Sequence, residues 1–139
     1  MDEHDAPTDG DAVPVRGGWH VALWALQILA AANFAFAGYE KLAGAPDQIA
    51  LFAVIGFGQW FRTLTGILEI LGALALLVPR LRALGALALV GVMIGALVAC
   101  FALGTSPLTA WVDLVIVSLI GWGRRGELTL SWVLGGHKR

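Results

Sequence analysis

Charged residues are scarce in this sequence, and this scarcity limits what kind of protein it can be. They make up 14% of its 139 residues, against roughly 25% in an average soluble domain. Hydrophobic residues make up 58%, which is more apolar surface than a water-soluble chain of this length could bury. The length suits one domain and is too short for two independent cores. The composition therefore predicts a small integral membrane protein.

Reactive and metal-binding residues are also few. Cys100 is the only cysteine, which excludes an internal disulfide, a CxxC redox pair and an all-cysteine metal or iron–sulfur site. No pair of histidines lies within an apolar segment to bind haem. The net charge of −1 gives no basic field of the kind that binds nucleic acid.

The known catalytic motifs are absent as well. The sequence has no phosphate-binding loop, zinc-protease motif or serine-hydrolase motif, and no carboxylate cluster that would hold a metal. Whether the protein is an enzyme therefore stays open. A redox cofactor would have to be bound without a covalent link, as a quinone is, or belong to another subunit.

Four apolar segments are candidates for crossing the bilayer, which takes roughly 20 helical residues. They run from about 19 to 38, 60 to 78, 83 to 103 and 108 to 122. The last is the shortest, so we expect it to tilt little or to lie where the bilayer is thin. A turn at Gly104 to Pro107 makes the last two segments antiparallel neighbours. The predicted fold class is all-α, a four-helix transmembrane bundle over residues 19–123.

The remaining segments are expected to lie outside the bilayer core. Residues 1–18 are rich in acidic residues and proline, a composition that favours a disordered tail. Between the first two spans, Pro46-Asp47-Gln48 is typical of a helix start, and the apolar run after it is too short to span. This loop is expected to hold a short helix in the membrane surface. Residues 124–139 are expected to lie on the inner surface.

The positive residues predict which way the bundle faces. With four spans, both termini and the 79–82 loop share one side, and most of the Lys and Arg residues lie there: Arg16, Arg80, Arg82, Arg124, Arg125, Lys138 and Arg139. Only Lys41 and Arg62 lie on the other side. Because positive residues are retained in the cytoplasm, both termini are expected to be cytoplasmic, in a multi-pass protein of the plasma (inner) membrane.

Ionisable residues at membrane depth are costly, so they are candidates for function. Glu69 and Asp113 are the two that fall well within the spans. At about 1.5 Å per residue, Glu69 lies about 10 Å inward of Arg62, and Asp113 lies about 8 Å inward of the start of its helix. Asn33 in the first span and Cys100 in the third lie within about 8 Å of the same membrane face.

The neighbours of these residues indicate that they face the interior of the bundle. One helical turn from Glu69 the residues are small or polar, whereas leucines occupy the other faces. The face that contains Asn33 has the same character. The sequence therefore predicts an inward-facing polar pocket in the outer half of the membrane, with Lys41 and Arg62 at its mouth. Its predicted members are Asn33, Glu69, Asp113 and Cys100.

Each of these residues also has a structural interpretation. Glu69 is a ligand-binding or proton-handling group, a subunit contact, or one half of an ion pair that locks the helices. Asp113 is open to the same interpretations. Cys100 is a packing residue or a reactive thiol. Asn33, like Gln27, is explained by hydrogen bonding between helices.

Several of these residues fall into a recognisable pattern. The pattern begins at Asn33 and continues through Ala37-Gly38-Tyr39-Glu40-Lys41-Leu42, Arg62-x-x-x-Gly66-x-x-Glu69-Ile70-x-Gly72-Ala73, Leu76-Leu77-Val78-Pro79-Arg80 and Gly95-Ala96. With these motifs the sequence resembles the DoxX-like membrane proteins. The likeness covers all of the chain except its tails, and Gly-x-x-Glu followed by Leu-Leu-x-Pro is its most specific part.

The resemblance implies a four-helix membrane protein of a bacterium or archaeon. The family is named after a small subunit of a membrane oxidoreductase that passes electrons from thiosulfate to quinone, and related members are associated with thiol redox defence. Many similar members have a histidine where Cys100 stands, so a histidine-dependent chemistry does not carry over, whereas Glu69 does. The positions that the resemblance carries over are Lys41, Arg62, Gly66, Glu69, Gly72 and Pro79.

Three functions are consistent with these observations. The first is a non-catalytic or accessory subunit of a quinone- or thiol-linked redox system, in which the pocket binds a quinone head group, Glu69 accepts a proton, and Arg62 or Lys41 positions an anion. The second is a permeation or transport protein for a proton or small solute, and the third is a scaffold for a catalytic partner. Besides the lipid bilayer, the expected partners are a redox subunit or a second copy of the chain, the latter contacting a ridge of small residues in the third span: Gly91, Gly95 and Ala99.

Overall fold

The computed structural model describes residues 15–125, and this part of the chain is helical throughout, with no β-strand. The helices, in chain order, are α1 (Val15–Ala43), α2 (Pro46–Ile55), α3 (Gln59–Leu77), α4 (Arg82–Leu103) and α5 (Leu108–Gly123). The expected all-α fold class is confirmed. The short helix expected from Pro46 is present as α2, with that proline in its first turn.

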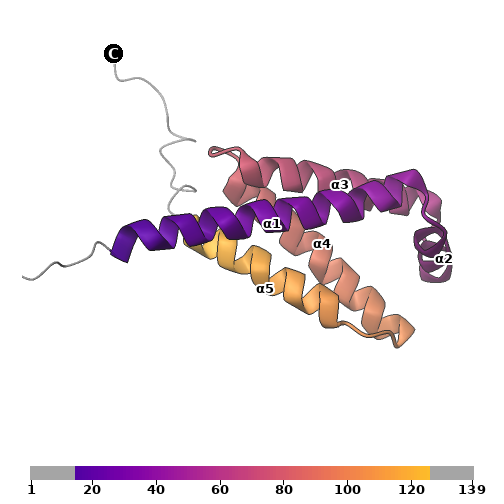
Figure 1. Ribbon diagram of the computed structural model, residues 1–139. Helices are drawn as coiled ribbons and strands as arrows, with labels where there is room; N and C mark the ends of the chain where they lie inside the picture. Colours follow the sequence, from indigo (N-terminus) through magenta and orange to yellow (C-terminus); the bar gives the residue numbers. More distant parts are fainter. Residues whose placement is uncertain (1–14, 126–139) are drawn as a thin grey trace, which may run out of the picture.

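The four longer helices run in alternating directions (Figure 1). Each packs against its neighbour in the chain, α1 against α3, α3 against α4 and α4 against α5, while α1 touches α5 over a shorter stretch. The start of α1 and the end of α5 lie at one end of the bundle, and α2 and the α4–α5 turn lie at the other (Figure 1). Toward the α2 end, the α1/α3 pair diverges from the α4/α5 pair (Figure 1).

Two close helix crossings depend on glycine. A Cβ atom added at Gly38 in α1 would lie 2.7 Å from the carbonyl oxygen of Gly66 in α3. A Cβ atom added at Gly85 in α4 would lie 2.7 Å from the Cβ of Ala75 in α3. Atoms cannot approach this closely, so only glycine allows these backbones to meet. In a bilayer, where lipid tails are as apolar as leucine, such close packing is a main source of helix association.

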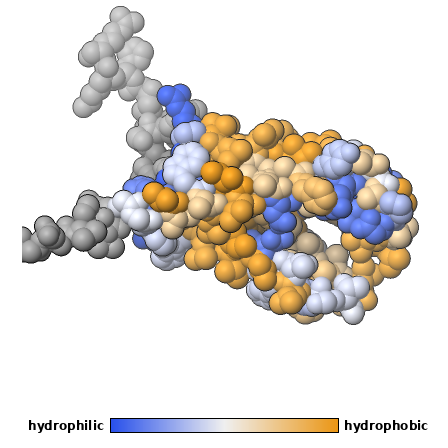
Figure 2. All heavy atoms as spheres, viewed as in Figure 1, coloured by the Kyte–Doolittle hydropathy of each residue, from blue (hydrophilic) through white to orange (hydrophobic). Residues whose placement is uncertain are grey.

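The apolar core lies where the helix pairs meet. Its largest fully buried apolar side chains come from all four long helices: Phe34, Leu76, Leu89, Val117 and Ile120. Most other large apolar side chains are exposed on the outer faces of these helices, and hydrophobic residues dominate the surface in Figure 2. This pattern is the one expected of helices that face lipid.

Among residues 15–125, three helices are long and apolar enough to cross a membrane: Gly17–Ala43 within α1, Gln59–Leu77 and Arg82–Leu103. α5 has 16 residues, or about 24 Å of helix, and is therefore shorter than the roughly 30 Å of hydrocarbon. The predicted membrane character is confirmed at this level. A count of four spans and the orientation of the termini stay predictions.

The helix bounds agree closely with the predicted segments except in α1. This helix begins at Val15, inside the segment predicted to be a tail, and continues to Ala43 rather than stopping at Gly38. It continues through Gly38, which is not among the glycines with a positive φ, and ends before Gly44, which has a left-handed φ of 75°. The extension places Lys41 on the helix. Residues 1–14 of the predicted N-terminal tail (1–18) and residues 126–139 of the predicted C-terminal tail (124–139) lie outside the described residues.

Candidate functional site

An ion pair between α1 and α3 is the best-defined polar contact of the predicted pocket. The Nζ atom of Lys41 lies 2.9 Å from Oε2 of Glu69. The Glu69 residue is only 2% exposed, and the Lys41 side chain is 15% exposed. The contact is an ion pair by distance, although its angles fall outside those of a hydrogen bond. A buried carboxylate needs such a cation, because an unpaired charge at this depth is strongly unfavourable.

The glycine crossing explains how this pair forms. Gly38 and Lys41 stand three residues apart on one face of α1, and Gly66 and Glu69 have the same spacing on α3. The Cβ of Lys41 would lie 3.0 Å from a Cβ added at Gly66. The two helices are therefore close enough for the lysine side chain to reach across to the carboxylate one turn away.

A second polar contact joins α1 to α5. The Nδ2 atom of Asn33 donates a hydrogen bond to Oδ1 of Asp113 at 3.1 Å. Asn33 is exposed and Asp113 is half-buried. Asp113 is also close enough to Glu69 for their charges to interact. The structure thus brings together Asn33, Lys41, Glu69 and Asp113 from three helices.

Arg62 lies in the first turn of α3 and does not join these residues. Its Nε atom donates to Oε1 of Gln59 at 2.7 Å. Its Nη1 atom is buried beside the Gly44 turn and, within the described residues, has no hydrogen-bond partner. Gln59 in turn donates to the carbonyl oxygen of Ile49 at 3.1 Å. Arg62 therefore helps to hold the junction of α1, α2 and α3.

Cys100 is a free, half-buried residue in the last turn of α4. Its carbonyl oxygen accepts a hydrogen bond from the backbone N–H of Thr105 at 3.0 Å, which closes the helix end. None of the hydrogen bonds described in residues 15–125 involves its sulfur. The helix end uses only the backbone of Cys100, and no contact among the described residues joins its thiol to the carboxylates.

The polar residues lie beside an opening between the two helix pairs. Figure 2 shows the surface hollowed between the α1/α3 and α4/α5 pairs toward the α2 end, with hydrophilic residues gathered beside the hollow. We call this opening the interpair cleft; the Asn33–Asp113 hydrogen bond joins the two helix pairs, from α1 to α5. A polar hollow on an otherwise apolar surface is the arrangement that holds the polar head of a ligand while its apolar part contacts lipid.

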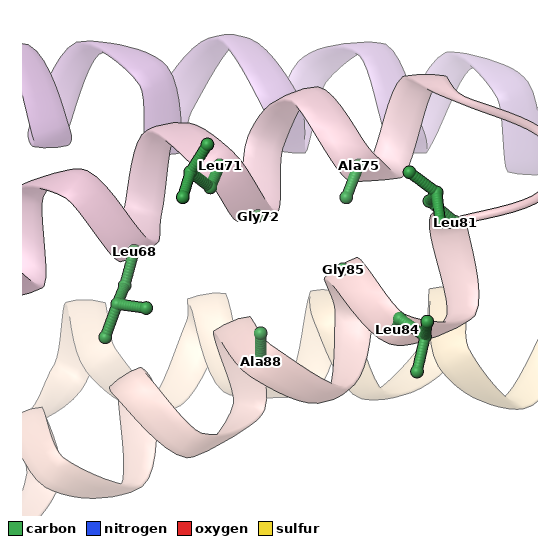
Figure 3. Close-up of a pocket in the computed structure, with 8 residues that line it drawn as sticks. All are labelled: Leu68, Leu71, Gly72, Ala75, Leu81, Leu84, Gly85 and Ala88. Atoms are coloured by element: carbon green, nitrogen blue, oxygen red, sulfur yellow. The ribbon is translucent and has the colours of Figure 1, made fainter.

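A separate groove runs along the outer faces of α3 and α4. It encloses about 190 Å³, and its lining is entirely apolar. Gly72 and Gly85 lie between the two helices, and Leu68 and Leu81 lie toward opposite ends (Figure 3). The groove offers no hydrogen-bonding side chain, so it lacks the chemistry of the interpair cleft.

The opposite end of the bundle contains a buried polar cluster that the sequence analysis did not predict as a unit. Gln27 is fully buried, and Arg82 and Arg124 are 5% and 7% exposed. Gln27 donates to the carbonyl oxygen of Leu76 at 2.8 Å and accepts from Nε of Arg124 at 2.9 Å. The Arg82 and Arg124 guanidinium carbons lie 5.0 and 6.0 Å from the Trp24 ring centroid, within the range of cation–π attraction.

This cluster ties the helix ends together. The Leu76 carbonyl is among the last four of α3, which have no partner within their own helix, and Gln27 satisfies it from α1. The signal that could have revealed the cluster is a glutamine in the middle of an apolar segment. In the sequence, Arg82 and Arg124 stand at the ends of apolar segments, where charged residues of loops are expected. They are buried only because α4 and α5 pack against α1 at this end.

The predicted small-residue ridge of α4 is open in the structure. A Cβ added at Gly91 or Gly95 would meet no atom within 4 Å. Neither glycine is therefore used in packing between the helices that the structure describes. Among residues 15–125, no group of three or more His, Cys, Asp or Glu side chains is placed to hold a metal.

Comparison with known proteins bears on the family. No curated protein and no solved structure shows a significant match to the chain. The family model of the DoxX-like family matches residues 25–122. This stretch includes α3 and α4, about two thirds of α1 and all but the last residue of α5, with the Lys41–Glu69 pair and the Asn33–Asp113 contact. The chain belongs to the DoxX-like family.

Proposed function

We propose that this DoxX-like membrane protein is an accessory subunit of a quinone- or thiol-linked redox system and binds a small lipophilic ligand in the interpair cleft. The observation that carries the proposal is the gathering of polar side chains from three helices at one end of an apolar bundle. These side chains belong to Asn33, Lys41, Glu69 and Asp113. Polar groups at this depth persist when they serve a function.

The arrangement of the helices supports binding rather than a simple lock. Dense packing encloses the Lys41–Glu69 pair, as it would in a structural lock, but it does not enclose the Asn33–Asp113 contact. Here the α1–α5 contact is short, the helix pairs diverge, and Asn33 remains exposed although it bonds to Asp113. A ligand with a ring-shaped polar head and an apolar tail, such as a quinone, matches a cleft of this kind.

In this proposal Glu69 is the proton-accepting group and Lys41 holds its charge. The ion pair keeps the carboxylate available in an apolar surrounding, and a second carboxylate, the half-buried Asp113, is held by Asn33 between the two helix pairs. A group in such a pair can exchange a proton when a ligand changes the local charge. The electron carrier would belong to a partner subunit, because the chain has no self-contained catalytic motif.

The proposed setting is the plasma membrane of a bacterium, with four spans and both termini in the cytoplasm. The common end of α1 and α5 supports this topology (Figure 1), as does the excess of positive residues on that side of the sequence. The interpair cleft then opens toward the outer face. α5 spans by lying nearly upright or where the bilayer is thinned.

Purification in mild detergent tests the redox role. We expect a redox subunit or a lipophilic cofactor to copurify with the protein. We also expect Glu69→Gln to lower the activity of the complex in membranes. Glu40→Gln is the matched control, because Glu40 is a partly exposed carboxylate near the same end of α1. Full activity of the Glu69→Gln complex, with Glu40→Gln also unchanged, would contradict the role given to Glu69.

Permeation of a proton or small solute is a second candidate, favoured by the nearness of Glu69 and Asp113 beside the cleft. Its test is flux into proteoliposomes that contain only this protein. A flux above that of empty liposomes, lost in Asp113→Asn, would favour it over the redox role. Vesicles that stay as tight as empty ones would eliminate it.

A scaffold role is a third candidate, favoured by the open Gly91 and Gly95 face of α4. Small residues let a second helix approach closely, so this face suits a partner subunit or a second copy of the chain. Gly91→Leu would block the approach and should release a copurified partner or convert an oligomer to a monomer. A retained partner and an unchanged oligomeric state would remove this candidate.

A further inference from the structure

Neither of the two cations predicted at the mouth of the pocket, Lys41 and Arg62, pairs with Asp113. Lys41 is paired with Glu69 at 2.9 Å. Arg62 donates to Gln59 and lies beside the Gly44 turn. Among residues 15–125, no cation lies within ion-pair distance of Asp113. The cleft therefore presents a carboxylate rather than a positive charge.

The Asp113 carboxylate can accept at least one more hydrogen bond. Its Oδ1 atom accepts from Asn33 at 3.1 Å, and no hydrogen bond among the described residues reaches Oδ2. The residue is half-buried and lies about 8 Å from the start of α5. A carboxylate oxygen at this depth is stabilised by a hydrogen-bond donor, and bonds to charged groups are stronger than those between neutral groups.

The position of Asn33 supports the same conclusion. Its amide holds the Asp113 carboxylate from α1, across the contact between the two helix pairs. One N–H of Asn33 Nδ2 is used in this bond, which leaves Oδ1 as a further acceptor and the second N–H as the one remaining donor of the amide. The side chains that bridge the cleft thus present mainly acceptor atoms. A ligand whose head only accepts hydrogen bonds, or carries negative charge, is poorly matched to them.

We infer that the interpair cleft recognises a hydrogen-bond donor on its ligand, a phenolic hydroxyl or an ammonium group, through the Asp113 carboxylate held by Asn33. This inference rests on the proposed function, since it assumes that a ligand occupies the cleft. It revises the expectation that Arg62 or Lys41 positions an anion. The recognised form of a quinone-like ligand is then the reduced one, whose hydroxyl groups donate where the carbonyl oxygens of the oxidised form accept.

Matched probes test the inference on the full-length protein in lipid nanodiscs. Binding is measured by equilibrium partition against protein-free nanodiscs, without oxygen, for decyl-benzoquinol and decyl-benzoquinone, and for decylamine and decanoate. Each pair shares its tail and differs in whether the head donates or accepts. The quinol–quinone pair tests a phenolic hydroxyl as the hydrogen-bond donor, and the decylamine–decanoate pair tests an ammonium group. We expect a donor to bind roughly tenfold more tightly than its matched acceptor, the effect of one charge-assisted hydrogen bond.

Variants test whether the preference for hydrogen-bond donors depends on Asp113. Asp113→Asn should abolish it, and Asp113→Glu, which restores a carboxylate, should retain it. Asp47→Asn is the matched control, because it removes an exposed carboxylate from α2. A preference that survives Asp113→Asn would overturn the inference.

The outcomes also separate this inference from the proposed function. If decyl-benzoquinone or decanoate binds as tightly as its donor counterpart or more so, the inference is wrong and ligand binding by the cleft stands. If none of the four probes binds above the protein-free nanodiscs, the proposed ligand-binding function is wrong, and the inference falls with it.

Discussion

At the scale of single residues, the polar groups of this protein come in matched contacts rather than as isolated charges. Glu69 has Lys41, Asp113 has Asn33, and Gln27 connects an α3 carbonyl to an arginine. In an apolar surrounding each group depends on its partner, because the partner replaces the water that was lost. The loss of stability when one of these side chains is removed therefore depends mainly on the partner that remains buried without it.

The Lys41–Glu69 pair gives the first prediction. Lys41→Met should destabilise the protein by about 3–5 kcal/mol, because it leaves the Glu69 carboxylate buried without a cation. The double variant Lys41→Met/Glu69→Met should recover most of this loss, since no charge then remains to be buried. Thermal unfolding in detergent, arranged as a double-mutant cycle, measures both effects. Additive losses in the two single variants would show that the two charges are not coupled.

Gln27 gives the second prediction. Gln27→Leu removes the donor to the Leu76 carbonyl and the acceptor for Arg124, so we expect a loss of about 1–3 kcal/mol of stability. Ile28→Leu, at the neighbouring exposed position, serves as the control and should have little effect. Unfolding of the purified variants in detergent compares them. Equal stability of Gln27→Leu and the parent protein would show that the cluster contributes nothing to holding the helix ends.

At the scale of the helices, glycine positions determine which faces meet. Gly38 and Gly66 let α1 and α3 cross closely, and Gly85 lets α4 approach α3. The sequence does not distinguish these glycines from Gly91 and Gly95. A Cβ atom added at either of the latter would meet no atom of the described residues within 4 Å. Small residues mark faces where approach is allowed, and the other helices determine which of those faces is used.

This contrast gives the third prediction. Gly38→Ala places a methyl group 2.7 Å from a backbone oxygen of α3 and should destabilise the protein by about 1–3 kcal/mol, since the helices must move apart. Gly91→Ala adds a methyl group in open space and should be neutral or slightly stabilising, because alanine favours helix. Detergent unfolding distinguishes the two. A Gly38→Ala protein as stable as Gly91→Ala would contradict the close crossing.

At the scale of the whole molecule, alternating helices place the polar contacts at two separate ends. The cluster around Gln27 lies at the end where α1 starts and α5 finishes, and the ion pair and the Asn33–Asp113 contact lie toward α2. The first end is closed by buried arginines, and the second is where the helix pairs diverge. The proposed function therefore places the ligand at the end where the helix pairs diverge, away from the buried arginines.

Topology gives the fourth prediction. On a Cys100→Ala background, Asp47→Cys and Thr105→Cys should react with an impermeant thiol reagent added outside intact cells, and Arg80→Cys and Arg125→Cys should react only after the cells are opened. All four positions are exposed in the structure. Protection of all four, or the reverse pattern, would contradict the proposed orientation. External labelling of Arg125→Cys alone among the inner positions would show that α5 does not span.

The sequence by itself determined the helical class, the membrane character and the short helix at Pro46, because apolar segment length and helix-start residues are local properties. It also singled out Asn33, Glu69 and Asp113, since polar residues are conspicuous in apolar segments. Only the tertiary structure decided their partners. Lys41 rather than Arg62 meets Glu69, Asn33 rather than a cation meets Asp113, and Arg82 and Arg124 lie buried around Gln27. Those choices depend on how closely and at what angle the helices cross, which side chains far apart in the sequence determine together.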